Sequence, residues 1–310
     1  MKRNIVIGPP GTGKTTFLKD KVDKLINGGH CRPEEIGYFS FTVKAAEEIR
    51  DRVTNEDWSE AELKKMYPYF CTLHSLAYKR LQLQQSQIMD QSDYDDLSRD
   101  TGRFFVNKMK KGNGMDISMP TAKSEYQDLI NLAYAKFPDD EDRLNQIFRT
   151  VKLSDYGARN TIEQMDVDLK NFKRDRDKLE YVDYFNHFLK KKNPPPLKYL
   201  FVDEAQDLSA HQWQVINMIQ EIAKPIETYV AGDDDQAIFR WAGADIEHFI
   251  AMANNDANTI IPLTQSYRIP RSVHTLATNL AQSISRRIDK SYEPRDEEGE
   301  RKVLNIRPLN

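Results

Sequence analysis

The segment "NIVIGPPGTGKTTFLKDKV", residues 4–22, decides the fold of this chain. A short β-branched run ends at Gly8, a loop of glycine and proline follows, and apolar residues then recur at helical spacing. From Gly8 to Thr15 the loop reads G-x-x-x-x-G-K-T, which is the full P-loop pattern between a strand and a helix. The segment therefore predicts a phosphate-binding loop on an α/β sheet.

The chemistry of such a loop depends on its backbone and on two side chains. Glycines let backbone N–H groups turn toward phosphate oxygens. Lys14 would supply a positive charge to the β- and γ-phosphates, and the Thr15 hydroxyl would ligate Mg²⁺. The full set of predicted phosphate-binding residues is Gly8, Pro9, Pro10, Gly11, Thr12, Gly13, Lys14, Thr15 and Thr16. The alternative, a glycine-rich turn without a ligand, fits an eight-position match poorly.

Four further short apolar runs predict buried parallel strands, at residues 36–41, 199–204, 227–233 and 259–263. Polar residues and then a helical pattern follow each run, and strands that alternate with helices indicate a parallel sheet. This alternation disappears between about residues 80 and 180, where the segment is polar and has helical spacing. We therefore expect an α/β domain with a helical insertion.

Composition sets wide limits on function. The chain has 310 residues and 36.1 kDa, which leaves room for two domains. With 39% hydrophobic and 30% charged residues and no long apolar run, we expect a soluble protein without a membrane segment. Cys31 and Cys71 lie far apart without metal-ligand spacing, which fits a reduced, cytoplasmic compartment. Basic clusters at 108–112, 170–178 and 189–192 fit solvated helix faces as well as polyanion binding.

The stretch "YLFVDEAQDLS", residues 199–209, predicts the second half of the phosphate site. An apolar strand that ends in two acids places both at the carboxyl edge of the sheet. Asp203 is suited to hold Mg²⁺ through its water shell, and Glu204 is suited to polarise an attacking water. A pair of surface acids at a strand end is the alternative, and the upstream P-loop favours the functional interpretation.

Two later stretches add candidate residues. In "VAGDDDQAIFRWAGAD", residues 230–245, Gln236 is placed to sense a γ-phosphate or to orient water. Phe239 and Trp241 offer stacking faces for bases, although such aromatics alone more often belong to a core. In "LTQSYRIP", residues 263–270, Arg268 could stabilise charge on a transferring phosphate, although a lone arginine is usually a surface residue.

Taken together, these stretches resemble superfamily 1 DNA helicases of the UvrD/Rep/PcrA type. The P-loop resembles motif I, and "FTVKAAEEI" (41–49) resembles motif Ia. "TLHSLAYKRL" (72–81) is similar to the DNA-contacting segment that follows, and "KLEYVDYFNHFL" (178–189) to the segment ahead of motif II. "VDEAQDLS", "GDDDQAIFRWAGAD" and "LTQSYRIP" resemble motifs II, III and IV. The resemblance runs from residue 4 to about residue 285 and is weakest within 80–180.

The resemblance implies ATP and Mg²⁺ as cofactors and single-stranded DNA as a partner. It implies catalytic roles for Lys14, Glu204, Gln236 and Arg268, and metal binding by Thr15 and Asp203. Gln236 and Arg268 would sense the γ-phosphate, and Tyr267 would stack on adenine. The implied single-strand contacts are Phe41, Thr42, His74, Phe239 and Trp241, with Trp241 as the main base-stacking platform.

The resemblance also implies a domain plan. A RecA-like ATP-binding domain (1A) would span 1–80 and 180–285, with a helical insertion (1B) at 81–179 and a truncated second RecA-like domain (2A) at 286–310. Three departures qualify this plan. The chain starts too close to its first strand for the usual glutamine-containing adenine segment, Val43 stands where motif Ia usually has asparagine, and nothing after residue 285 resembles motifs V and VI.

We therefore expect a monomeric ATP-dependent helicase that translocates on single-stranded DNA, present here as its ATP-binding front half. One lobe should bind nucleotide but hydrolyse it slowly. A nucleotide-dependent DNA-binding module without motor activity is the alternative, which the missing back half favours and the intact Glu204 and Gln236 disfavour. A P-loop NTPase acting on something other than nucleic acid is disfavoured by the segments around Phe41, His74 and Trp241.

Overall fold

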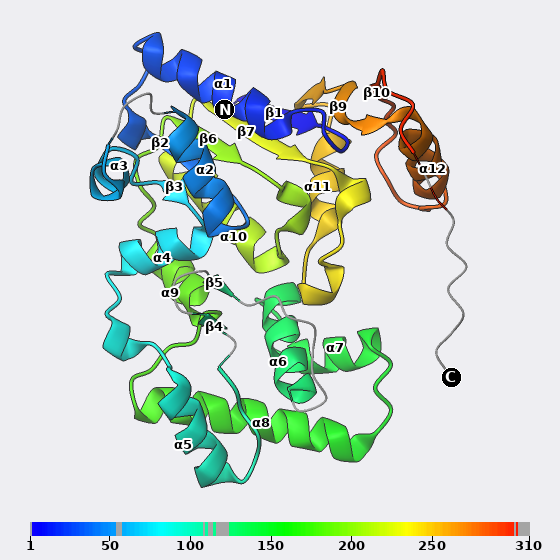
Figure 1. Cartoon of the computed structure of the whole chain (residues 1–310). Coiled ribbons are helices and arrows are strands. Elements are labelled where there is room, and N and C mark those ends of the chain that lie inside the picture. Colours follow the sequence, from blue (N-terminus) through cyan, green and yellow to red (C-terminus); the bar gives the residue numbers. More distant parts are fainter. Residues whose placement is uncertain are drawn as a thin grey trace.

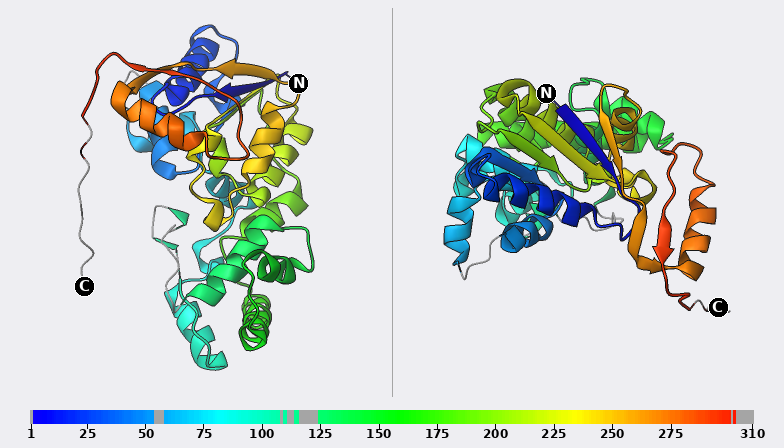
Figure 2. Two further views of the ribbon diagram at one scale, coloured as in Figure 1. Left: turned by 90° about the vertical axis from the view of Figure 1, so that its right-hand side faces the viewer. Right: turned by 90° about the horizontal axis from the view of Figure 1, so that it is seen from above.

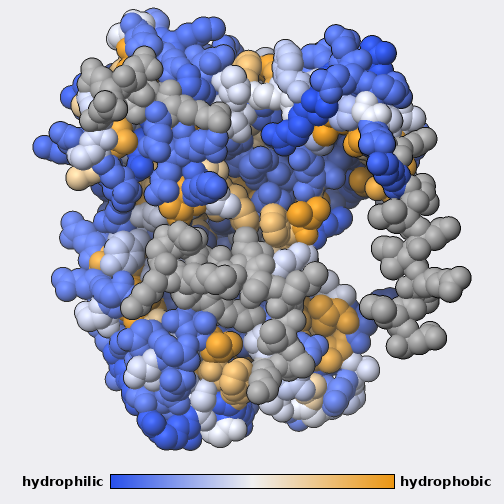
Figure 3. Space-filling model, in the orientation of Figure 1, coloured by the Kyte–Doolittle hydropathy of each residue, from blue (hydrophilic) through white to orange (hydrophobic). Residues whose placement is uncertain are grey.

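The computed structural model describes residues 2–53, 58–107, 109–110, 114–115, 124–300 and 302. Figure 1 shows an α/β body, a helical body beneath it in that view, and a smaller C-terminal part beside the sheet. Figure 3 shows that this side of the molecule is largely hydrophilic. Within the described ranges, no helix has the length and apolar character needed to cross a bilayer.

The α/β body is built on six strands in the order β3-β2-β6-β7-β1-β8, and each recorded pair is parallel. The strands are β1 (Lys2–Ile7), β2 (Ile36–Phe39), β3 (Phe70–Cys71), β6 (Tyr199–Val202), β7 (Glu227–Gly232) and β8 (Thr259–Pro262). Because the strands run the same way, their carboxyl ends share one edge, where ligands bind in open α/β sheets.

Side chains alternate between the two faces of the sheet, and each face has its own core. Val6 packs with α1 (Lys14–Asn27) and α2 (Val43–Val53) on one face. Ile5 and Ile7 point to the other face, in a core shared with four helices. Those helices are α4 (Leu73–Leu81), α9 (Asp183–Lys191), α10 (Ala210–Ala223) and α11 (Ile246–Ala253). Burial on both faces explains why the inner strands β2, β6 and β7 are almost continuously apolar.

The four further predicted strands are present, with ends that differ by one or two residues, but the prediction that 259–263 is buried was wrong, because β8 is the edge strand of the sheet and is largely exposed. The strand predicted at 199–204 ends at Val202, so the two acids that follow lie beyond the sheet. The pattern did not reveal β3, because a two-residue strand is too short to show alternation. The other short elements are α3 (Glu60–Met66) and the 3₁₀ helices η1 (Pro33–Glu35), η2 (Gln85–Gln87), η3 (Ala205–Asp207), η4 (Asp234–Gln236) and η5 (Arg240–Ala242).

The helical body has a separate core. It contains α5 (Gln91–Thr101), α6 (Glu125–Lys136), α7 (Arg143–Thr150) and α8 (Tyr156–Asp175). Leu97, Ile130, Phe148 and Ile162, one from each helix, are almost fully buried in that core. We expected no strands in this segment, and this was wrong, because β4 (Met109–Lys110) and β5 (Gly114–Met115) form a short antiparallel pair. The rest of the basic cluster predicted at 108–112 lies outside the described residues.

The C-terminal part lies outside the main sheet. It contains β9 (Gln265–Pro270), α12 (Arg271–Ala281) and β10 (Glu293–Arg295), and β9 pairs with β10 in parallel. The two views of Figure 2 show this part beyond the β8 edge of the sheet. The predicted second RecA-like domain extends to residue 310, and of residues 301–310 the structure describes only Lys302.

Candidate nucleotide site and nucleic-acid interface

The P-loop leads directly into the N-terminus of α1. The N-cap residue of α1 is Gly13, so no side chain caps the helix. The first turn of α1 contains no acidic residue. The first N–H groups of a helix have no partner within the helix, and the helix dipole favours a negative charge beside them. This end of α1 is therefore suited to receive phosphate oxygens.

Lys14 places its charge inside the loop. Its side chain is buried, and its ammonium donates a hydrogen bond to the Gly8 carbonyl at 2.9 Å. Thr12 tightens the same turn by donating from its hydroxyl to the Pro9 carbonyl at 2.8 Å. The acceptor at Gly8 is neutral, so this hydrogen bond does not neutralise the positive charge of Lys14, which also acts on the carboxylates of Asp207 and Asp233.

Thr15, at the start of α1, contacts Asp203, which follows β6. The two residues meet although β7 lies between β1 and β6 in the sheet. The Thr15 hydroxyl donates to Asp203 Oδ2 at 3.0 Å, and the Tyr38 hydroxyl donates to the same oxygen at 2.8 Å. Burial and then the charge of Glu204 raise the pKa of Asp203, while the two hydroxyl bonds oppose the rise.

These two residues fit Mg²⁺, which takes hard oxygen ligands and is usually bound through one or two carboxylates together with waters and phosphates. Across the described residues no cluster of three or more His, Cys, Asp or Glu forms a closed metal cage.

Glu204 begins η3 in a left-handed conformation, with φ 52° and ψ 46°. For a residue other than glycine such strain costs on the order of 1–3 kcal/mol and often marks functional sites. The Gln206 side-chain amide donates to Glu204 Oε2 at 2.9 Å and to Asp207 Oδ2 at 3.2 Å. Burial, helped by the charge of Glu204, raises the pKa of Asp207 to about 7. We did not predict a role for Gln206 or Asp207, although both stand in the quoted "DEAQD".

The residues that follow β7 contact this acidic turn. Gln236 donates from its side-chain amide to Asp233 Oδ2 at 2.6 Å. The backbone N–H of Asp233 donates to Gln206 Oε1 at 3.1 Å. Hydrogen bonds therefore join the ends of β6 and β7, and Gln236 belongs to the same network as Glu204.

The segment 263–270 closes the other side of the loop. The Tyr267 N–H donates to the Gly11 carbonyl at 2.9 Å, and the Ser266 hydroxyl donates to the Pro10 carbonyl at 2.8 Å. A Cβ at Gly11, whose φ is +73°, would lie 2.4 Å from Cβ of Arg268. Arg268 is thus held against the P-loop, while the Tyr267 side chain stays 75% exposed. We did not predict Ser266, whose fully buried hydroxyl makes this contact.

Three aromatic side chains form a row at the carboxyl edge of the sheet. Phe41 stacks on Phe239 with ring centroids 5.4 Å apart, and Phe239 lies 6.4 Å from Trp241. Trp241 is 40% exposed, so it is not a core residue. Thr42 is exposed beside the row, and its hydroxyl accepts from the Ala45 N–H at the start of α2. We call Phe41, Phe239 and Trp241 the aromatic row.

His74 has different surroundings. Its ring stacks on Tyr181 at 3.4 Å and lies 3.9 Å from the ring of Phe185, so both neighbours come from the segment before β6. Burial, with a smaller effect of His211, lowers the pKa of His74 well below its usual value. His74 is therefore neutral at pH 7. It packs against the rings of Tyr181 and Phe185 and not against the aromatic row.

The basic cluster at 170–178 is paired with acids. Lys173 contacts Glu180 and Asp183 at 3.0 and 2.8 Å. Arg176 contacts Asp96, and Lys178 contacts Asp93, at 2.7 and 2.8 Å. These pairs favour the structural interpretation of that cluster over a free polyanion-binding surface.

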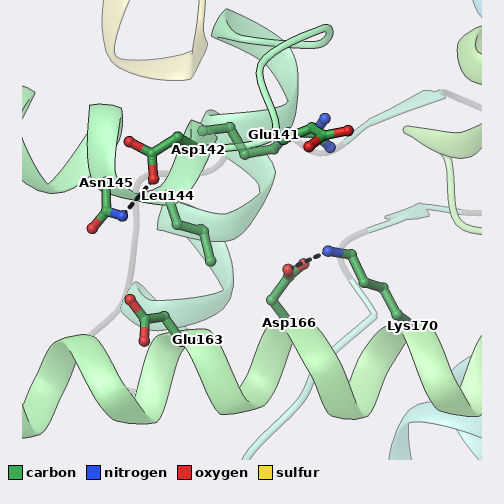
Figure 4. Close-up of a pocket in the computed structure, with 8 residues that line it drawn as sticks. Glu141, Asp142, Leu144, Asn145, Glu163, Asp166 and Lys170 are labelled. Atoms are coloured by element: carbon green, nitrogen blue, oxygen red, sulfur yellow. Dashed lines mark hydrogen bonds and ion pairs between the residues drawn. The ribbon is translucent and has the colours of Figure 1, made fainter.

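A cavity of about 350 Å³ lies in the helical body, between the start of α7 and α8 (Figure 4). Its lining is Glu141, Asp142, Arg143, Leu144, Asn145, Glu163, Asp166 and Lys170. Lys170 is paired with Asp166 at 2.6 Å, and the Asn145 amide donates to Asp142 at 2.5 Å. With more acids than cations in its lining, this cavity is unsuited to phosphate.

The parallel sheet, the P-loop and the acids at its carboxyl edge define a nucleotide-binding domain of the P-loop class. The chain belongs to the UvrD/REP helicase family, since residues 1–257 match the family model of the UvrD/REP helicase N-terminal domain. The segments that resemble motifs I, II, III and IV lie together at one edge of the sheet, joined by the hydrogen bonds described above.

Relatives of this family include a probable DNA helicase of Mycoplasma pneumoniae, 28% identical over 302 residues, which cover 93% of this chain and 54% of that protein. The ATP-dependent DNA helicase PcrA of Staphylococcus aureus is 25% identical over 311 residues, covering 96% of this chain and 40% of PcrA. PcrA of Staphylococcus epidermidis is also 25% identical, over 92% of this chain and 39% of its own length. The chain thus spans about half, or less, of the length of these relatives.

Proposed function

We propose that this chain forms the first ATP-binding lobe of a helicase that hydrolyses ATP to move along single-stranded DNA. One observation carries the proposal: the segments after β1, β6 and β7 and the segment 263–270 are joined at one edge of the sheet. The Thr15–Asp203, Asp233–Gln206 and Ser266–Pro10 hydrogen bonds make those connections.

In this proposal Lys14 and the N-terminus of α1 bind the phosphates, with Thr15 and Asp203 holding Mg²⁺. The ion would neutralise charge on the β- and γ-phosphates. Glu204 accepts a proton from the attacking water, Gln236 orients that water, and Arg268 contacts the γ-phosphate from the opposite side of the loop. The exposed ring of Tyr267 provides a stacking surface for adenine.

The aromatic row provides the DNA surface. Exposed aromatic rings stack bases with little dependence on sequence, and each stacked base contributes on the order of 1–3 kcal/mol. We propose that Trp241 and Phe239 stack bases, that Phe41 supports them, and that Thr42 contacts the backbone. His74 would contact the strand near the start of α4.

We also propose the division into a 1A domain (1–80 and 180–285), a 1B insertion (81–179) and the start of a 2A domain (286–310). The separate core of the helical body supports the insertion. The elements β9 and α12 lie with β10 outside the main sheet, which favours a third unit that begins near residue 265 instead of 286. We further propose that the protein acts as a cytoplasmic monomer.

The nucleotide site is tested by Lys14→Ala. The ammonium is the main positive charge of the loop, so its loss should weaken the binding of Mg²⁺–ATP at least tenfold, measured by calorimetry. Lys24→Ala, at the exposed far end of the same helix, is the matched control and should leave the affinity unchanged. Equal affinity in the wild type and in Lys14→Ala would remove ATP from this loop.

A further inference from the structure

Three consecutive acids at the end of β7 surround a lysine from the C-terminal part. The Lys290 ammonium lies 3.1 Å from Asp233 Oδ1 and 2.9 Å from Asp235 Oδ2, and it also contacts Asp234 Oδ1. The Lys290 side chain is only 6% exposed, and the Asp233 and Asp234 side chains are 0% and 1% exposed. A buried lysine therefore compensates buried carboxylates.

Further contacts fix the same segment. Arg287 makes a two-pronged contact to Asp235, at 2.9 and 2.7 Å, and the Ile288 N–H donates to Asp234 Oδ2 at 2.6 Å. We call residues 287–290 the clamp segment. It lies between α12 and β10, within the C-terminal part, and its contacts with residues 233–235 connect that part with the end of β7.

Charge makes this connection depend on Lys290. A buried carboxylate is costly unless it is paired and hydrogen-bonded. Burial lowers the pKa of Lys290, but the three carboxylates outweigh burial and leave it raised, so the ammonium is charged at pH 7. Without this cation, Asp233 would lose its ionic partner, and we expect it to move or to change its hydrogen bonds.

Asp233 is also the residue that holds Gln236. Its Oδ2 accepts the Gln236 amide at 2.6 Å while its Oδ1 faces Lys290. Its N–H donates to Gln206, whose amide donates in turn to Glu204. Asp233 thus connects the clamp segment with Gln236 directly and with Glu204 through Gln206.

We propose that Lys290 is a positioning residue of the ATP site, which fixes Asp233 and so holds the Gln236 amide where it distinguishes a nucleoside triphosphate from a diphosphate. The inference rests on the proposed function of Gln236.

The test compares the affinities of Mg²⁺–AMP-PNP and Mg²⁺–ADP by calorimetry. In Lys290→Met, the affinity for AMP-PNP should fall at least fivefold while that for ADP changes less than twofold, as in Gln236→Ala. A second variant, Lys290→Met with Asp234→Asn, removes one charge of each sign. If Lys290→Met alone is too unstable to titrate, the double variant should show the same loss of AMP-PNP affinity with little change in ADP affinity. A thermal melt accompanies each titration.

Lys173→Met is the matched control. Lys173 is also a mostly buried lysine between two carboxylates, Glu180 and Asp183, but it lies in the helical body. Its replacement should lower the melting temperature and leave the ratio of the two affinities unchanged.

The outcomes separate the two proposals. If the wild type binds neither nucleotide, the proposed function fails, and this inference fails with it. If Gln236→Ala loses the preference for AMP-PNP but the Lys290 variants keep it, the positioning role is overturned while the nucleotide site stands. A parallel loss of both affinities in the Lys290 variants, with the ratio kept, would make Lys290 merely structural and would also overturn it.

Discussion

Glu204 reaches the phosphate side of the sheet because β6 ends at Val202 and the chain turns there through a left-handed residue. Gln206 then fixes the Glu204 carboxylate from two positions further along the chain. A carboxylate intended to accept a proton from water must be held in position, because misplacement weakens general-base assistance. The left-handed backbone and the Gln206 contact would both serve this requirement in the role that we propose for Glu204.

His211 gives the fold a dependence on acid. It is buried on α10, its Nε2 has no hydrogen-bond partner within the described part of the chain, and its ring meets Phe185 edge-on. Burial lowers the pKa of His211 to about 4. Because this lies below the unfolded value of about 6.5, the stabilisation is complete above pH 6.5 and is lost as the pH falls toward 4.

We therefore predict that His211→Leu is less sensitive to acid than the wild type. Between pH 7.5 and pH 5 the wild type should lose about 2 kcal/mol more of its free energy of unfolding than the variant, measured by urea titration. His187→Gln replaces an exposed histidine of α9 and should follow the wild type. Parallel pH profiles for the wild type and His211→Leu would show that His211 titrates normally.

At the scale of elements, the aromatic row depends on three separate segments. Phe41 precedes α2, while Phe239 and Trp241 follow β7, and α6 supports the loop from below. Gly243 has φ +101°, and a Cβ there would lie 2.8 Å from Cβ of Ala135, so only glycine lets η5 approach α6 this closely. The helical body thus helps to position the proposed DNA surface.

We predict that Trp241→Ala weakens the binding of a labelled single-stranded oligonucleotide about tenfold, measured by fluorescence anisotropy. ATP affinity and melting temperature should change little, because the ring is 40% exposed. Tyr156→Ala removes another exposed aromatic, 76% exposed on α8, and serves as the control that should leave DNA binding unchanged. Unaltered affinity in a stably folded Trp241→Ala would exclude the stacking role.

The elements were predictable where one local pattern specified them. Buried strands such as β1 and β7 are continuous apolar runs, and the P-loop is a contiguous motif, so both could be predicted from the sequence. The contacts that complete the site join distant residues. Ser266 bonds to Pro10 and Lys290 to Asp233, and no local pattern pairs a serine or lysine with a partner so far along the chain. The two-residue β3 was missed for lack of length.

At the scale of the whole molecule, the proposed ATP and DNA sites occupy neighbouring parts of one sheet edge. Gln236 contacts the phosphate side through Asp233, and Phe239, three residues later, belongs to the aromatic row. A change at the γ-phosphate and a change at the DNA surface would therefore act on the same short loop. The clamp segment contacts the start of this loop, at residues 233–235, and so connects it with the C-terminal part.

If one sheet edge joins ATP chemistry to single-stranded DNA, as we propose, the strand should change the rate of phosphate release. We measure release from Mg²⁺–ATP by this chain alone, with a single-stranded oligonucleotide, and with the corresponding duplex, using Glu204→Gln as the control. We predict slow release that the single strand raises severalfold and the duplex does not. In Glu204→Gln, release should fall by about 10²-fold or more while ATP still binds. Release that is equal with and without the single strand, or that persists in Glu204→Gln, would contradict the account.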